Sequence, residues 1–274
     1  MKSFPLTSLS FFHLICVLLT CLFLFLATEI KADERENCFH HSKICYLILE
    51  GRKSVHISVQ NNYDFPMRVS LHVTGHNTSP PKATKNTLLA PHEMKDILSL
   101  RVNAPNEWRY SWTSQLHPET GDAKHDDTVL YQFPFPKTKS HPISQGPNNP
   151  FSHTGPNRFA IDWAMPVGSE ILAAREGKVI ALREDSSQGG ASNKYKTEEN
   201  YLWIQHPDST IGQYLHLKKN GVIVQVGDWV KKGQLIAYSG NTGYSTAPHL
   251  HFHVSSSQKK GAAFKSHPIN FVSK

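Results

Sequence analysis

The sequence predicts an all-β protein of two domains, the first a small antiparallel sandwich. Apolar and polar residues alternate in short segments, which is the period of half-buried strands, and the first region contains no convincing helix. A segment rich in proline, glycine, asparagine and serine at residues 136–150 separates two alternating regions. The chain of 274 residues is long enough for each region to bury a core of its own.

The N-terminus has the features of an export signal. Lys2 precedes an apolar run at residues 11–27, and a short polar stretch follows up to Ala32. We expect residues 1–32 to be a signal peptide cleaved near Ala32, which would place the protein in the periplasm or outside the cell. An uncleaved membrane anchor is the alternative, because the run is close to the shortest that spans a bilayer.

The cysteines are consistent with an oxidising compartment. Two of the four, Cys16 and Cys21, lie in the segment that we expect to be removed. The other two, Cys38 and Cys45, either close a small disulfide loop near the mature N-terminus or remain free thiols.

The net charge of +7 suits an anionic partner such as the bacterial cell wall or a membrane surface. Nucleic acid is also anionic, but the lysines and arginines form neither a dense run nor a basic helix. We therefore predict no nucleic-acid partner, and no membrane partner beyond an uncleaved N-terminal anchor.

The first region, residues 44–135, is predicted to form the sandwich. His56 and His72 fall on the polar side of their alternating segments, so we expect them at the surface. The turn-forming segment at residues 61–66 predicts a hairpin connection. Strands are expected at residues 55–59, 67–73, 97–102, 108–112 and 129–135.

The second region, residues 151–274, follows the predicted linker at residues 136–150. A polar, glycine-containing loop at residues 186–200 is expected to be mobile and to form one wall of a cleft. Strands are expected at residues 171–182, 201–204, 212–217, 222–226, 234–238 and 248–254.

Three alternating histidines in the last of these strands indicate a metal site. Residues at i and i+2 of a strand leave the same face, so His249, His251 and His253 point one way. Neutral imidazole is a common zinc ligand. With 17 histidines in the chain, however, a His-x-His pair also arises by chance.

Three further residues strengthen this interpretation. Asp162 is a lone carboxylate among apolar neighbours, where burial is costly without a partner or a metal ion. His153 precedes it, and His216 lies between two leucines of a predicted strand. Two histidines and one carboxylate would leave a fourth zinc position for water, as a catalytic site requires.

The chain from residue 145 to residue 254 resembles the lysostaphin-type zinc metallopeptidases, which are cell-wall endopeptidases. The resemblance rests on four stretches in the expected order: FSHTGPNRFAIDWAMPVGSEILAAREGKV, QHPDSTIGQYLHL, VQVGDWVKKGQLIAYSGNTG and APHLHFHV. It implies an antiparallel β-sheet peptidase domain with an active-site groove. It also implies that His153, Asp162 and His251 hold Zn²⁺ and that His216 and His249 are catalytic residues that do not bind the metal.

The sequence departs from the family pattern at two positions. Eight residues separate His153 from Asp162 where three are commonest, and Arg158 occupies the shorter spacing. His253 stands where a glutamate is common, and we expect it to have a peripheral role, with tuning of the site as the alternative.

We therefore predict an exported zinc endopeptidase that acts on the peptide cross-links of bacterial peptidoglycan. Which histidine is the general base stays open, as do the bond that is cut and the role of the first domain. The cross-link is of the diaminopimelate type or a glycine bridge. A non-catalytic adaptor of the same fold that activates amidases is the alternative, and a zinc-scavenging envelope protein is a third hypothesis. Retention of all five site residues favours the enzyme.

Overall fold

A computed structural model describes residues 33–40 and 42–273 of the chain. Strands dominate these residues, which contain no α-helix and two short 3-10 helices, η1 (Gly155–Asn157) and η2 (Asn193–Tyr195). The all-β prediction is confirmed. The predicted signal peptide or anchor, with Cys16 and Cys21, lies outside the described residues. Within them, no helix is both long and apolar enough to cross a bilayer.

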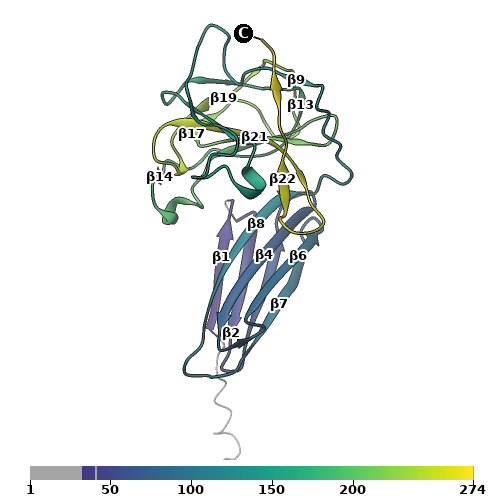
Figure 1. Ribbon diagram of the computed structural model, residues 1–274, viewed down its shortest axis with the longest axis vertical. Coiled ribbons are helices and arrows are strands. Elements are labelled where there is room, and N and C mark those ends of the chain that lie inside the picture. The colour runs from purple at the N-terminus through teal and green to yellow at the C-terminus, as the bar shows by residue number, and fades with distance from the viewer. Residues whose placement is uncertain (1–32, 41, 274) are drawn as a thin grey trace, which may run out of the picture.

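The first part of the chain folds into the two facing sheets of a sandwich (Figure 1). One sheet has the order β1-β2-β3-β7-β5 and the other β6-β4-β8. Their inward side chains share one core, which includes Ile57 of β3 and Leu71 of β4. The strands are β1 (Asp33–Phe39), β2 (Ile44–Glu50), β3 (Ser54–Asn61), β4 (Met67–His76), β5 (Thr78–Ser79), β6 (Lys82–Leu89), β7 (Met94–Val102) and β8 (Arg109–Pro118).

The alternation in the sequence decides which side chains enter this core. In β3, Val55 and Ile57 are buried, whereas His56 between them is exposed, as expected. Strands β1 and β6 were not predicted, because their sequences DERENCF and KATKNTLL are too polar to show an apolar period. They form because each pairs along its length with an apolar neighbour, β2 or β4.

A disulfide bond joins the first two strands. Cys38 and Cys45 face one another across the β1–β2 pair, and their sulfur atoms are 2.07 Å apart. Of the two alternatives left open by the sequence, the structure therefore has the disulfide rather than free thiols.

The second part is built on an eight-stranded sheet of order β10-β11-β21-β16-β15-β13-β18, with β22 paired to β21. A three-stranded sheet, β12-β19-β17, and the small parallel pairs β14–β20 and β23–β9 complete it. The strands are β9 (Leu130–Tyr131), β10 (Ile143–Gln145), β11 (Ile161–Ala164), β12 (Glu170–Leu172), β13 (Gly177–Arg183), β14 (Gly189–Gly190), β15 (Tyr201–Gln205), β16 (Ile211–Leu215), β17 (Leu217–Val222), β18 (Trp229–Val230), β19 (Leu235–Ser239), β20 (Gly243–Tyr244), β21 (His249–Ser257), β22 (Phe264–Ser266) and β23 (Asn270–Phe271).

Some predicted strands are divided or shifted in the structure. The strand expected at residues 171–182 is two strands, because β12 pairs with β19 in one sheet and β13 with β15 in another. The connection between them contains Arg175, whose guanidinium binds Asp208 at 2.6 Å. Of the strand expected at residues 222–226, only Val222 lies in a strand. It is the last residue of β17, which the polar segment before it forms.

Residues 129–150 are more closely tied to the second part than their composition indicates. Only Leu130 and Tyr131 of the strand expected at residues 129–135 form a strand, which pairs with β23. Tyr131 and Phe135 are buried in the core of the second part. The predicted linker contains β10, which pairs with β11. Proline and glycine limit regular structure in this segment, which is why it was predicted to be a linker. Its contacts with distant strands form only in the folded protein, so composition does not reveal them.

The two parts share a packed boundary. Strand β15 is buried on both faces: Leu202 and Ile204 enter the core of the second part, while Tyr201 and Trp203 join that of the sandwich. The hydroxyl groups of Tyr63 and Tyr201 are hydrogen-bonded across the boundary at 2.7 Å. The sandwich is thus held against the sheet that carries the histidines.

Candidate metal centre

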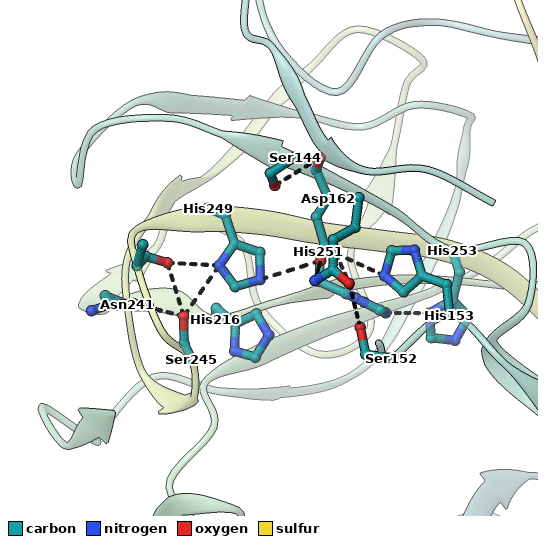
Figure 2. A network of polar contacts seen from close by, with 12 residues as sticks. Ser144, Ser152, His153, Asp162, His216, Asn241, Ser245, His249, His251 and His253 are labelled. Carbon is teal, nitrogen blue, oxygen red and sulfur yellow. Dashed lines mark hydrogen bonds and ion pairs between the residues drawn. The ribbon is translucent and has the colours of Figure 1, made fainter. Parts of the chain in front are cut away.

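Strand β21 lies between β11 and β16 and brings the predicted site residues together (Figure 2). In the β11–β21 pair, Asp162 is directly opposite His251 and Ala164 is opposite His249. In the β16–β21 pair, Leu215 is opposite His251, so His216 follows at the end of β16. The antiparallel register therefore places Asp162 beside His251. His216 follows the end of the ladder, where its φ of 63° interrupts the alternation of the strand.

Three donor atoms converge at this position. Asp162 Oδ1 lies 2.8 Å from His251 Nδ1 and 3.2 Å from His153 Nε2. One ligand atom from each of these residues lies within 4.8 Å of the other two, and all three residues are buried. Two imidazole nitrogens and one carboxylate oxygen are a donor set that suits Zn²⁺. The residues present therefore fit the metal that the resemblance implies.

The remaining nitrogen of each candidate ligand histidine has a partner of its own. His153 Nδ1 donates to the Gly146 carbonyl at 2.9 Å, which leaves the unprotonated Nε2 as the atom that can bind a metal ion. His251 Nε2 lies 3.0 Å from His253 Nδ1, an arrangement that leaves His251 Nδ1 facing Asp162. Such outer contacts fix the tautomer and the ring orientation of metal ligands.

The environment keeps the carboxylate ionised. Burial by itself would raise the pKa of Asp162, but hydrogen bonds to His153 and His251 hold this pKa well below its usual range. Burial likewise opposes a charge on His153, yet its contact with Asp162 raises the pKa of His153 above the ordinary value. The Asp162 carboxylate thus supplies a negative charge between the histidines.

Gln145 is a site residue that the sequence interpretation assigned to a linker. Its Nε2 donates to Asp162 Oδ2 at 2.7 Å, and its Oε1 accepts a hydrogen bond from Ser152 at 3.0 Å. The Gln145 amide therefore orients the carboxylate through the oxygen that His153 and His251 do not contact. Only its position at the start of the stretch that resembles the peptidases indicated a role in the site.

His216 and His249 lie side by side next to the three donors, with ring centroids 4.5 Å apart. His216 Nδ1 donates to the Thr242 carbonyl at 2.8 Å, and His249 Nδ1 donates to the Ala247 carbonyl at 2.8 Å. Each ring therefore keeps Nε2 free as an acceptor. Figure 2 shows the His249 ring directed toward Asp162, where Nε2 lies 3.9 Å from Oδ2.

Burial keeps both of these imidazoles neutral. It lowers the pKa of His216 to about 4, with a further contribution from His251, and it lowers the pKa of His249 to about 4, with a further contribution from His216. His216 also has a φ of 63°, which is unusual for a residue other than glycine. Such backbone strain is common at functional sites.

The sequence-predicted residues are all brought together. His253, for which the sequence left a peripheral role or tuning of the site, is 2% exposed and contacts His251. Arg158, at the shorter family spacing, is exposed and contacts Asn148 instead of the donor atoms. The structure therefore places His153, and not residue 158, beside Asp162.

The site opens into a cavity of about 280 Å³, which gives a ligand access to the histidines. His216, His249 and His251 line it on one side, and Phe151 and Tyr244 contribute apolar surface. An accessible carboxylate–histidine centre with two free, neutral imidazoles beside it is typical of metal-dependent hydrolases.

The chain carries a peptidase M23 domain: residues 157–265 match the model of Peptidase family M23. Asp162, His216, His249 and His251 fall within the matched residues, whereas His153 lies four residues before them.

Curated relatives match part of the chain. An uncharacterised metalloprotease of Buchnera aphidicola is 41% identical over 46% of this chain and 31% of its own length. Lysostaphin of Staphylococcus simulans is 38% identical over 38% of this chain and 19% of its own. The peptidoglycan DD-endopeptidase ShyB of Vibrio cholerae is 38% identical over 43% of this chain and 23% of its own. The matches thus span less than a third of each relative.

Proposed function

We propose that the protein is an exported, zinc-dependent endopeptidase that hydrolyses peptide cross-links of bacterial peptidoglycan. The observation that carries this proposal is the convergence of His153, Asp162 and His251 beside two neutral histidines in an M23 domain. His153 Nε2, Asp162 Oδ1 and His251 Nδ1 are the proposed zinc ligands. Zinc at this position would lower the pKa of water toward neutrality and polarise a peptide carbonyl.

The two remaining histidines are the proposed proton-transfer groups. Because backbone carbonyls accept the Nδ1 protons of His216 and His249, the Nε2 atom of each ring is free to take a proton from water or to donate one. One histidine would act as general base, and the other would donate to the leaving amine or stabilise charge on the carbonyl oxygen. No residue of the chain needs to form a covalent intermediate.

The proposed substrate class follows from the relatives and from the charge of the chain. Two of the relatives are a peptidoglycan DD-endopeptidase and lysostaphin, and another DD-endopeptidase, ShyA of Vibrio cholerae, matches at 33% identity. The net charge of +7 suits an anionic polymer such as the cell wall.

Export is supported by two independent features. The N-terminal sequence has the order of charge, apolar run and polar stretch that secretory signals have. The Cys38–Cys45 disulfide is of a kind that persists in oxidising compartments and is rare in the cytosol.

The test is digestion of purified cell wall by residues 33–274. Released muropeptides are identified by mass spectrometry, beside a chelated sample and a His251→Ala variant. Loss of cross-linked dimers only with the untreated wild type would support the endopeptidase and identify the bond. A protein that binds zinc but leaves every cross-link intact would contradict the proposal and favour the adaptor.

A further inference from the structure

A second cavity of about 610 Å³ lies beside the active-site cavity, between the sandwich and the histidine-bearing sheet. The sandwich contributes Phe39 and His40 to its wall, along with residues 114–116. Glu199 and Leu215 line both this cavity and the active-site cavity, as do Ser152 and Asn157. A substrate that crosses the candidate metal centre can therefore continue into a space that the sandwich helps to form.

Glu199 stands at the junction of the two cavities. Of the described residues that line them, it is the only carboxylic acid. Its Oε1 lies 3.3 Å from His216 Nδ1, and its side chain is 29% exposed. A group that binds this carboxylate would lie next to His216, in the cavity that also exposes His249 and His251.

The protein itself supplies little compensation for this carboxylate. Within the described part of the chain, His216 is the one ion-pair partner of Glu199, and its Nδ1 proton is already donated to the Thr242 carbonyl at 2.8 Å. The nearby Arg183 is engaged elsewhere: its Nε binds Asp185 at 2.6 Å, and its Nη2 binds Glu198 at 3.2 Å.

The nearest lysine in the cavity wall does not fill this role either. Lys196 is exposed, and its ammonium lies 5.8 Å from the centroid of the Tyr244 ring. Among the described residues, no ion pair joins Lys196 to Glu199. A poorly compensated carboxylate at the wall of a cavity is complemented by a ligand cation, because a buried charge is stable only when it is paired.

We propose that Glu199 binds a side-chain ammonium group of the stem peptide, on a residue whose amine is not part of the cleaved bond. This subsite rests on the proposed endopeptidase function and narrows its substrate class. A diaminopimelate or lysine residue carries such an ammonium, whereas a glycine bridge has no side chain to offer. Glu199 is thus a specificity-determining residue that contacts substrate away from the reacting atoms.

The test uses one cross-linked muropeptide dimer in three forms that differ at the free ammonium. The group is left native, dimethylated to keep the charge, or acetylated to remove it. Wild-type residues 33–274 should cleave the first two alike and should show a KM about tenfold higher on the acetylated dimer, as expected for loss of a charge-assisted hydrogen bond. A lysine-type dimer compared with a diaminopimelate-type dimer identifies which ammonium is preferred.

Three variants separate a substrate contact from a structural role. Glu199→Gln should cleave all three dimers with the KM that the wild type has on the acetylated form, while its zinc content and melting temperature stay unchanged. Glu199→Asp, which keeps the charge, should still discriminate. Glu170→Gln, at an exposed carboxylate outside both cavities, should behave as wild type. Equal KM values for the wild type on all forms, or discrimination that persists in Glu199→Gln, would overturn the subsite.

Binding without turnover distinguishes failure of the subsite from failure of the proposed function. Calorimetric titration of the same three dimers into metal-free wild type and metal-free Glu199→Gln measures affinity whether or not the protein is an enzyme. The wild type should bind the charged forms about tenfold more tightly than the acetylated form, and the variant should bind all three equally. Equal affinity of the wild type for all three would sink the inference even if cleavage occurs.

Discussion

Asp162 and His251 face one another across strands β11 and β21, with 2.8 Å between Asp162 Oδ1 and His251 Nδ1. The Asp162 carboxylate also contacts His153 and Gln145. Its two oxygen atoms therefore hold three other side chains in place. Because the ladder fixes this pair in register, the donor set is pre-organised by the backbone. The consequences can be tested one residue at a time.

Replacing Asp162 with asparagine should remove the central charge while keeping the shape of the side chain. Changes in the outer contacts of metal ligands lower metal affinity by about 10–100-fold, so loss of this charged ligand should cost at least that much. Zinc affinity is measured by competition with a chromogenic chelator. Asp64→Asn, at an exposed carboxylate of the sandwich, is the matched control. Wild-type zinc affinity in Asp162→Asn would contradict the proposed ligand.

His216→Ala and His249→Ala should keep zinc but lose turnover. Removal of a positioned acid or base lowers rates by about 10²–10⁴-fold, and neither side chain belongs to the cluster of three donors. Zinc content and kcat are measured on the same preparations. His56→Ala, at an exposed histidine of β3, should change neither. A variant that lost zinc in proportion to its activity would have to be reassigned as a ligand.

His253→Ala should weaken zinc binding without touching the metal position. His253 Nδ1 is the partner of His251 Nε2 at 3.0 Å, and its loss would free the His251 ring to adopt the other tautomer or rotate. We expect an affinity loss of about 10–100-fold, the range found for partners of metal ligands. Asparagine, which offers an acceptor, should restore part of it. Unchanged affinity in His253→Ala would return this residue to the peripheral role that the sequence suggested.

Acid should destabilise the fold through buried histidines away from the metal centre. Burial lowers the pKa of His117 and of His206 to about 4, below the ordinary value of 6.5. Between these values the unfolded chain binds more protons than the folded one, so the free energy of unfolding falls as the pH decreases from 6.5 toward 4. Each histidine contributes about 1 kcal/mol per pH unit within this window and nothing above it.

Urea denaturation of metal-free protein at several pH values checks this dependence. His206→Asn keeps a donor for the Glu176 carbonyl, which His206 Nδ1 contacts at 2.9 Å, but cannot titrate. Its unfolding free energy should fall less steeply with decreasing pH than that of the wild type. Identical slopes for the two proteins would show that His206 does not contribute.

The sequence was most informative where local pattern and residue chemistry coincide. The period of two in His249, His251 and His253 requires no tertiary information to place three imidazoles on one face of a strand. Asp162 was identifiable because a carboxylate in an apolar segment needs a partner. The sandwich strands β3 and β4 were likewise evident from their alternation.

Contacts between distant segments could not be predicted from the sequence in the same way. Polar residues such as Gln145 and Glu199 resemble ordinary surface residues until the fold brings them within 2.7 Å of Asp162 and 3.3 Å of His216. Part of the predicted linker forms strand β10 because it pairs with the edge of β11. Composition does not reveal that pairing.

The sequence by itself determined the class of fold, the donor types and the candidate site residues, because these depend on side-chain identity and short-range period. Only the tertiary structure decided that His153 meets Asp162 despite the eight residues between them, that His253 contacts His251, and that the sandwich completes a cavity at Glu199. The physical reason is that hydrogen-bond geometry and burial depend on which distant strands pair, and local sequence does not specify that pairing.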